Sequence, residues 1–234
     1  MPAHPLQAIL VAHGSPADPE PQDRWMQALA TRARLWAPGW QIRGTTLALP
    51  GALEAALAAL PRALIYPFFM AEGFFTRRQL PARLAAAGRA DAMQLPAFGH
   101  DPGMAALLAR TASTAARAHG LPETATLLLA AHGSQVSRAS ATRTEEMAAA
   151  LRQLMRFAVV TGYVEEAPFL QDAARIPGPA LCLPFFATRA GHVSTDVPEA
   201  LDQAGFTGPL LPAIGEHADA ARLIAGALQA HAAA

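Results

Sequence analysis

Two histidines and a pair of glutamates in the second half of this chain carry the side chains that divalent transition metals prefer. His132 ends one apolar run, and the neighbouring pair Glu165 and Glu166 ends a second. His192 comes shortly after a third such run. Imidazole nitrogens together with a carboxylate suit cobalt, iron, nickel or zinc. These residues predict a metal site. The ligand set alone does not separate a metallohydrolase from a metal-delivery protein.

Each of these residues also has a structural explanation. The His-Gly pair at His132 can be a tight turn whose glycine takes a positive φ. His192 can cap the helix that follows it, and the glutamates can form a helix cap or a salt bridge, since a buried carboxylate needs a partner. Successive strand residues face opposite sides, so only one of Glu165 and Glu166 can face the site. Spacing alone leaves that choice open.

The chain repeats itself. Three short motifs return in the same order at nearly the same offset, which indicates an internal duplication. A linker-like AHGLPE at residues 118–123 combines Gly and Pro between the copies. We therefore expect two lobes, residues 1–119 and 120–234. The motifs are AHGS at 12–15 and 131–134, PFF at 67–69 and 184–186, and LPAFG or LPAIG at 95–99 and 211–215.

The two copies differ at the metal-binding positions. Aligning the repeats sets Phe75 opposite His192 and Leu47-Ala48 opposite Glu165-Glu166. A purely structural cap has no reason to become aromatic in one copy, so loss of a site from the first copy is the simpler explanation. In the first half only His13, from the first AHGS motif, keeps its counterpart. The sequence therefore predicts one complete site, in the C-terminal lobe.

Each half alternates short apolar runs with longer amphipathic segments. The runs ILVAH, IRGTTLAL, ALIYPFF and AMQLPAF correspond to TLLLAAH, FAVVTGYVEE, ALCLPFF and GPLLPAI. Such runs are typical of a parallel sheet covered on both faces. We predict an α/β fold of two tandem similar lobes, each a small doubly wound sheet of about four strands flanked by helices. Ligands of such sheets bind outside the carboxyl ends of the strands, where the metal-binding candidates fall.

Composition limits the classes of function. The 18 basic and 18 acidic residues balance to a formal net charge of zero, which gives no electrostatic footprint for nucleic acid. No apolar run approaches the ~18 residues of a membrane helix, and the N-terminus has no charged leader segment. The single cysteine, Cys182, fits a reducing compartment. We expect a cytoplasmic protein without nucleic-acid or membrane partners, for which two fused lobes make a monomer sufficient.

The motifs together resemble a known family. AHGS after the first strand, the segment YVEEAP, and LPFF followed five residues later by HVSTDVP are similar to the class II tetrapyrrole chelatases, of the sirohydrochlorin cobalto- and ferrochelatase type. The resemblance spans both halves. It implies the chelatase fold and the insertion of Co²⁺, or alternatively Fe²⁺, into sirohydrochlorin on the way to cobalamin or siroheme. The metal is then a substrate, and no further cofactor is implied.

The resemblance also implies roles for particular residues. It makes His132 and His192 catalytic, with Glu165 or Glu166 as the assisting carboxylate, and the expected metal ligands are His132, His192 and Glu165. Aromatic residues of the first half would lie against the macrocycle, and arginines would bind its carboxylates. The expected substrate-binding residues are His13, Phe74, Phe75, Arg77, Arg78, Arg138 and Arg189.

Other functions stay open at this point. A ferrochelatase would use the same ligands, because ligand identity does not separate Fe²⁺ from Co²⁺. A non-catalytic metal- or tetrapyrrole-binding protein is compatible with the incomplete first copy. Two α/β lobes are also found in periplasmic small-ligand binders, but the lack of a leader segment counts against that class.

Overall fold

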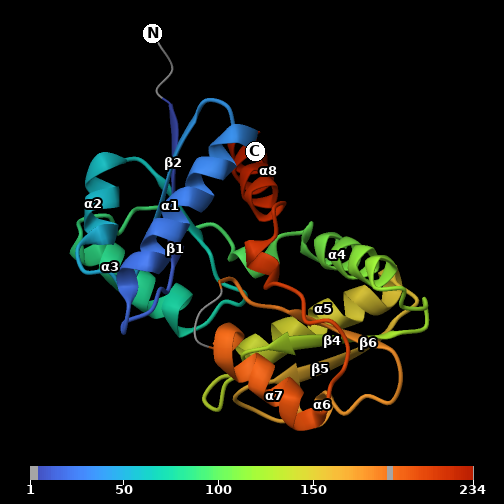
Figure 1. Cartoon of the computed structure of the whole chain (residues 1–234). Coiled ribbons are helices and arrows are strands. Elements are labelled where there is room, and N and C mark those ends of the chain that lie inside the picture. The colour runs from blue at the N-terminus through green and yellow to red at the C-terminus, as the bar shows by residue number, and fades with distance from the viewer. Residues whose placement is uncertain (1–4, 189–191, 234) are drawn as a thin grey trace. The chain divides into compact units, whose positions relative to one another are not determined.

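The computed structural model describes residues 5–188 and 192–233, and of residue 192 it describes the backbone but not the side chain. Packing divides the chain into two compact units. Unit 1 comprises Met1–Asp101 and Ala218–Ala234, and unit 2 comprises Pro102–His217. Each unit consists of a parallel sheet with helices packed on it (Figure 1).

The sheet of unit 1 has three strands within the described residues, in the order β2-β1-β3. The central strand is buried along its last five residues, as its apolar sequence requires. The strands are β1 (Leu6–Ala12), β2 (Trp40–Thr46) and β3 (Leu64–Pro67). The helices are α1 (Pro19–Trp36), α2 (Ala52–Ala59), α3 (Leu80–Ala86) and α8 (Ala220–Ala233), with the short helical turns η1 (Phe75–Gln79) and η2 (Phe98–His100).

Unit 2 repeats this plan, and its described strands have the order β5-β4-β6. None of the helices described in either unit is long and apolar enough to cross a membrane. The strands of unit 2 are β4 (Thr126–Ala131), β5 (Ala158–Tyr163) and β6 (Ala180–Pro184). The helices are α4 (Met104–Ala118), α5 (Ala139–Leu154), α6 (Leu170–Ala173) and α7 (Val197–Ala204), with the turns η3 (His192–Asp196) and η4 (Ile214–Glu216).

The two sheets match in order and register. The last residue of each central strand pairs with the last residue of its neighbour, Thr46 in unit 1 and Tyr163 in unit 2. The histidine of the AHGS motif follows at once, as His13 after β1 and as His132 after β4. The predicted α/β fold with two similar lobes is confirmed, and the two histidines stand at equivalent strand ends.

The prediction of about four strands in each lobe is wrong, because the fourth run forms only an isolated bridge. In unit 1 Gln94 bridges Ile65, and in unit 2 Leu210 bridges Cys182. The proline of each LPAFG or LPAIG motif stands two residues further on and has no N–H with which to continue the ladder. Each described sheet therefore keeps three strands.

Each sequence repeat ends in one long helix, α4 in the first and α8 in the second. Each of these helices packs on the unit formed by the other repeat. Helix α4 packs against α5 and β6 of unit 2, whereas α8 packs against α1 of unit 1. On α8, the Arg222 guanidinium lies 5.4 Å from the Trp36 ring centroid, and Gln229 donates a hydrogen bond of 3.0 Å to the Trp36 carbonyl. The expected boundary between residues 119 and 120 separates the two sequence repeats. The division into two packed units differs from it, because it follows which sheet each helix covers.

Steric contact explains why the LPAFG and LPAIG motifs both end in glycine. The N–H groups of Gly99 and Gly215 donate to the carbonyl of the second phenylalanine in the PFF motif, at 2.9 and 3.0 Å. A Cβ on Gly99 would collide with the backbone of Met70, and one on Gly215 with the backbone of Ala187. The PFF motif and the LPAFG or LPAIG motif therefore recur as a pair, because their backbones are in direct contact.

We expect Gly99→Ala to lower the free energy of unfolding by at least about 1–3 kcal/mol, because the added methyl group has no space against Met70. Gly226→Ala on α8 of the same unit is the control. Apart from the adjoining backbone of its own helix, none of the described atoms lies within 4 Å of its added Cβ, so the change should be neutral or stabilising by up to about 1 kcal/mol. Urea denaturation measures both. Wild-type stability in Gly99→Ala would contradict this explanation of the motif.

Candidate metal site

The turn after β4 presents His132 at the carboxyl end of the strand. Gly133 has φ +72°, and a Cβ there would come within 2.9 Å of side-chain atoms of Glu166 and Tyr163. Only glycine allows the turn to lie against these side chains. The Gly133 N–H also donates to Ser140 Oγ at 3.3 Å, which ties the turn to α5. The imidazole of His132 remains 40% exposed.

The contacts of His132 define its tautomer. Its Nδ1 lies 2.9 Å from the carbonyl oxygen of Gly133. A carbonyl oxygen only accepts, so Nδ1 carries the proton in this contact, and in the neutral ring Nε2 then carries the lone pair. Oε2 of Glu165 lies 3.7 Å from the same Nδ1. A neutral imidazole with its lone pair on Nε2 is a form that binds a metal ion.

The two adjacent glutamates have different surroundings. Glu166 accepts the Ser134 N–H at Oε1 and a guanidinium N–H of Arg138 at Oε2, both at 2.9 Å, and its side chain is only 11% exposed. Glu165 turns toward the imidazole of His132 and is 40% exposed. Glu165 is therefore the carboxylate that faces the histidine, while Glu166 braces the AHGS turn.

The sequence alignment of the two glutamates with Leu47-Ala48 is wrong by one residue. The N–H of Glu165 donates to the carbonyl of the AHGS histidine, and in unit 1 the same bond is made by the N–H of Ala48. The glutamates correspond to Ala48-Leu49. The error arises because the second copy is shorter between the AHGS motif and the end of its second strand. A single numbering offset therefore cannot align both the AHGS motifs and the ends of these strands.

A further carboxylate, Glu145 on α5, supports the strand next to the site and was missed from the sequence. Thr161 Oγ1 and the Tyr163 hydroxyl each donate to its Oε1 at 2.6 Å. Partial burial alone would raise the pKa of Glu145, but these two hydrogen bonds and the charges of Arg152 and Arg138 outweigh it, so the pKa lies below its ordinary value. The alternating Thr and Tyr on β5 were the available signal.

The third predicted ligand is only partly described. His192 begins the turn η3, but its side chain lies outside the described residues, and so does the whole of Arg189. In unit 1 the matching turn η1 begins at Phe75. Among the side chains that the structure describes, no three of His, Cys, Asp or Glu converge as a metal site requires. The described part of the candidate site is the pair of His132 and Glu165.

In unit 1 the equivalent histidine packs against one ring of an aromatic cluster. The ring centroids of His13 and Phe75 are 4.1 Å apart, and Phe75 in turn contacts Phe69 at 6.1 Å and Phe74 at 5.7 Å. The buried Nδ1 of His13 has no hydrogen-bond partner within the described part of the chain. Burial lowers the pKa of this imidazole. Unit 1 thus holds a neutral histidine in apolar surroundings.

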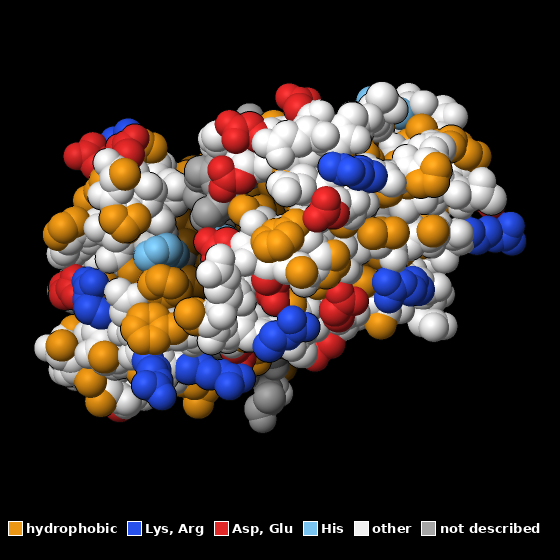
Figure 2. Space-filling view, turned by 90° about the horizontal axis from the view of Figure 1, so that it is seen from below, with side chains coloured by type: hydrophobic (Ala, Val, Ile, Leu, Met, Phe, Trp, Pro, Cys, Tyr) orange, Lys and Arg blue, Asp and Glu red, His pale blue; other side chains and the backbone are white. Residues whose placement is uncertain are grey.

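The residues predicted to line a substrate cleft lie on and next to η1. Phe74 is 65% exposed, and Arg77 pairs with Glu72 at 3.2 Å. Arg78 is exposed and makes no hydrogen bond or ion pair within the described residues. Arg138 in unit 2 is engaged by the glutamate that braces the AHGS turn. Figure 2 shows a face on which hydrophobic side chains gather beside a histidine, with arginines at their edge.

Comparison with known proteins gives several matches. The CbiX family model matches residues 126–230. The solved structure of CbiX, the terminal enzyme for biosynthesis of siroheme in denitrifying bacteria, is 48% identical with a TM-score of 0.89, over 96% of this chain and 98% of that one. A search of curated protein sequences finds no match.

Two further solved structures match at lower identity. SirB from Bacillus subtilis with Fe³⁺ is 13% identical with a TM-score of 0.74, over 97% of this chain and 96% of that one. A multi-domain protein of Deinococcus radiodurans with structural similarity to chelatases is 22% identical with a TM-score of 0.66, over 98% of this chain and 55% of that one. At these identities the two matches show the fold alone.

Two similar α/β units, each with a histidine at the end of its central strand, define a chelatase-like protein. The match of 48% identity over nearly the full length of both chains places this chain more closely. It belongs to the CbiX family, and the resemblance to the class II tetrapyrrole chelatases is confirmed.

The lowered pKa of Glu145 gives a pH prediction. A depressed carboxyl pKa contributes stability above the unfolded-state value of about 4.3, and this contribution is lost as the pH falls through the folded-state pKa. The difference in unfolding free energy between wild type and Glu145→Gln should be largest at neutral pH and shrink in acid. It should be modest, because the carboxylate is partly exposed to solvent.

Urea denaturation at a series of pH values measures this difference. The matched control is Glu146→Gln, which removes an exposed carboxylate paired with Arg143 on the same helix and should change stability little. A difference for Glu145→Gln that stays constant from neutral to acid pH would show that its charge makes no contribution.

Proposed function

We propose that the protein is a sirohydrochlorin chelatase that inserts a divalent metal, Co²⁺ in the first place, into the tetrapyrrole. The observation that carries the proposal is the pair of His132 and Glu165 at a strand end, in a chain of the CbiX family. Insertion of Fe²⁺ is the second candidate. It is favoured by the 48% identical relative, which is described as the terminal enzyme for biosynthesis of siroheme. Both reactions suit a monomeric cytoplasmic enzyme, which we also propose.

We assign the metal ligands as His132, His192 and Glu165. The carbonyl of Gly133 fixes the proton on Nδ1 of His132, so that Nε2 binds the ion. The internal repeat supports His192, because η3 begins where η1 begins in unit 1. In η1 that first residue is Phe75, whose ring lies 4.1 Å from His13. The repeat therefore supports His192 as the counterpart of Phe75.

The reaction replaces two pyrrole N–H protons by one divalent ion, so two protons must leave as the four ring nitrogens bind the ion. Imidazole ligands take the ion from water and release it to the ring nitrogens without a change of oxidation state. A carboxylate or a freed imidazole close to the ring accepts the protons. Glu165 is suited to this role, because Glu166 is already engaged by the Ser134 N–H and Arg138.

The substrate itself calls for flat apolar and basic surfaces. We propose that the aromatic cluster of His13, Phe74 and Phe75 binds the faces of the macrocycle. Sirohydrochlorin carries many carboxylates, and guanidinium groups bind carboxylates in a bidentate manner. Arg77, Arg78, Arg138 and Arg189 are proposed for this contact.

The assignment predicts unequal roles for the three histidines. His132→Ala and His192→Ala should each abolish nearly all Co²⁺ and Fe²⁺ insertion, because losing one of three ligands leaves too few donors to hold the ion. His13→Ala should leave substantial activity, because His13 packs against Phe75 in an apolar setting. Initial rates of insertion, followed by the visible spectrum of the tetrapyrrole, measure all three variants.

Circular dichroism controls for folding in each variant. If His13→Ala is as inactive as the other two while still folded, the working site requires both histidines at the strand ends and the single-site assignment fails. If the wild type binds metal and tetrapyrrole but never joins them, the protein is a binding protein and the chelatase assignment fails.

The arginines of η1 give a separate prediction. Replacing Arg77 and Arg78 together by Ala should weaken sirohydrochlorin binding while leaving Co²⁺ binding unchanged, since each charge-assisted contact contributes about 1.5–3 kcal/mol. Arg89→Ala is the control, because this arginine also lies in unit 1 but pairs with Asp91. Substrate affinity equal to wild type in the double variant would remove both arginines from the proposed contact.

A further inference from the structure

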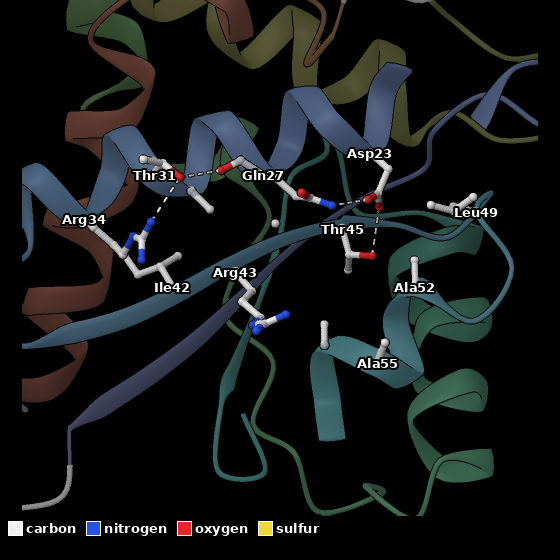
Figure 3. Close-up of a pocket in the computed structure, with 13 residues that line it drawn as sticks. Asp23, Gln27, Thr31, Arg34, Ile42, Arg43, Thr45, Leu49, Ala52 and Ala55 are labelled. Carbon is white, nitrogen blue, oxygen red and sulfur yellow. Dashed lines mark hydrogen bonds between the residues drawn. The ribbon is translucent and has the colours of Figure 1, made fainter. Parts of the chain in front are cut away.

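A cavity of about 440 Å³ opens between α1 and α2, beside the edge strand β2 of unit 1 (Figure 3). We call it the edge cavity. Its volume falls within the range of roughly 300–1,000 Å³ typical of small-molecule pockets. Part of the lining is apolar and built of small side chains, among them Ala30 of α1 and Ala52 of α2. None of the residues assigned to metal insertion or to the aromatic cluster lines it.

Two arginines line the edge cavity. Arg34 on α1 donates a hydrogen bond of 3.1 Å to the Thr31 hydroxyl, a neutral partner. Arg43 on β2 makes no hydrogen bond or ion pair within the described part of the chain. Both also line a neighbouring hollow of about 330 Å³ along the same strand. Two positive charges therefore line the space between the helices, and neither has an acidic partner among the described residues.

The carboxylate in this lining does not neutralise the arginines. Asp23 is buried and accepts hydrogen bonds from Gln27 Nε2 at 2.7 Å, Thr45 Oγ1 at 3.1 Å and the Thr46 N–H at 2.9 Å. Figure 3 shows its carboxylate turned to Thr45 and Gln27, with the Arg43 side chain projecting separately from β2. Asp23 fastens α1 to the end of β2, so its charge is already committed to holding the fold.

The second copy shows that the fold does not need an arginine at the position of Arg43. The strand register puts Val160 of unit 2 at the position of Arg43. On that edge Arg152 of α5 donates to the carbonyl of Val159 at 2.8 Å and so satisfies the strand itself. Unit 1 has the same sheet order but keeps Arg43 available for another partner.

We propose that the edge cavity binds a small organic anion. Its carboxylate or phosphate group contacts Arg34 and Arg43, and a short apolar part lies on the alanines of α1 and α2. Guanidinium groups bind both kinds of anion through paired hydrogen bonds, so the head group is defined by its charge. The site is independent of metal insertion and stands whether or not that function is confirmed.

The test uses three probes of equal chain length: hexanoate, hexyl phosphate and hexan-1-ol. Isothermal titration calorimetry of the full chain at fixed ionic strength measures their binding. We expect saturable binding of one or both anions and none of the alcohol. Arg43→Gln and Arg34→Gln should each weaken it by about tenfold or more, because a charge-assisted contact is lost. The matched control is Arg62→Gln, an exposed arginine of unit 1 outside this lining, which should bind like wild type.

Each result of the titrations either supports or overturns the anion-binding proposal. Preference between the two anions identifies the head group and supports the proposal in either case. Binding of hexan-1-ol as strong as that of the anions, wild-type affinity in Arg43→Gln, or no saturable binding of any probe would overturn it. Because Arg43 is exposed, circular dichroism should show a folded variant, and its rate of metal insertion should equal that of wild type.

Discussion

The parallel pairing between the central strand and its neighbour continues past the ends of the strands, and the candidate site depends on this continuation. In unit 2 the N–H of Val164 donates to Ala131 at 3.1 Å, and the N–H of Glu165 donates to the carbonyl of His132 at 2.9 Å. These two bonds bring an imidazole and a carboxylate from distant parts of the sequence to the same strand edge. Gly133 makes the continuation possible, because its missing side chain leaves room for Tyr163 and Glu166.

The duplicated scaffold carries different chemistry in its two copies. Unit 1 makes the same backbone bonds at Leu47 and Ala48, but there His13 packs against Phe75 and its buried Nδ1 has no described partner. Unit 2 gives His132 a carbonyl and a carboxylate. An imidazole in apolar surroundings is held neutral and suits contact with a flat ring, whereas one beside a carboxylate suits a cation. The two copies therefore share their backbone geometry at this strand end but differ in the side chains around the histidine.

Much of this arrangement could be predicted from the sequence, because parallel strands meet at one edge and the repeats mark the strand ends. Both AHGS histidines fall where the apolar runs stop. Other features depend on information that spacing does not contain. Which glutamate faces His132 depends on the competing hydrogen bonds of Glu166, and the fourth strand fails because a proline interrupts its ladder.

The role of Glu145 and the packing of α8 were not predicted from the sequence. A helical pattern shows which face is apolar, but it does not show which carboxylate on the other face reaches a neighbouring strand. Likewise, α4 and α8 have similar apolar faces, and only tertiary packing decides that α8 covers α1. The equivalence of η1 and η3 is the exception, because the repeated PFF motif and the following proline fix Phe75 and His192 in register.

The central claim is that a single divalent ion is held by two imidazoles and one carboxylate in the C-terminal half. X-ray absorption at the cobalt edge of the Co²⁺-loaded protein, without tetrapyrrole, measures the ligand set directly. We expect one Co²⁺ per chain with two imidazole nitrogens, and one imidazole fewer in His192→Ala. Two ions per chain, or a spectrum unchanged in His192→Ala, would contradict it.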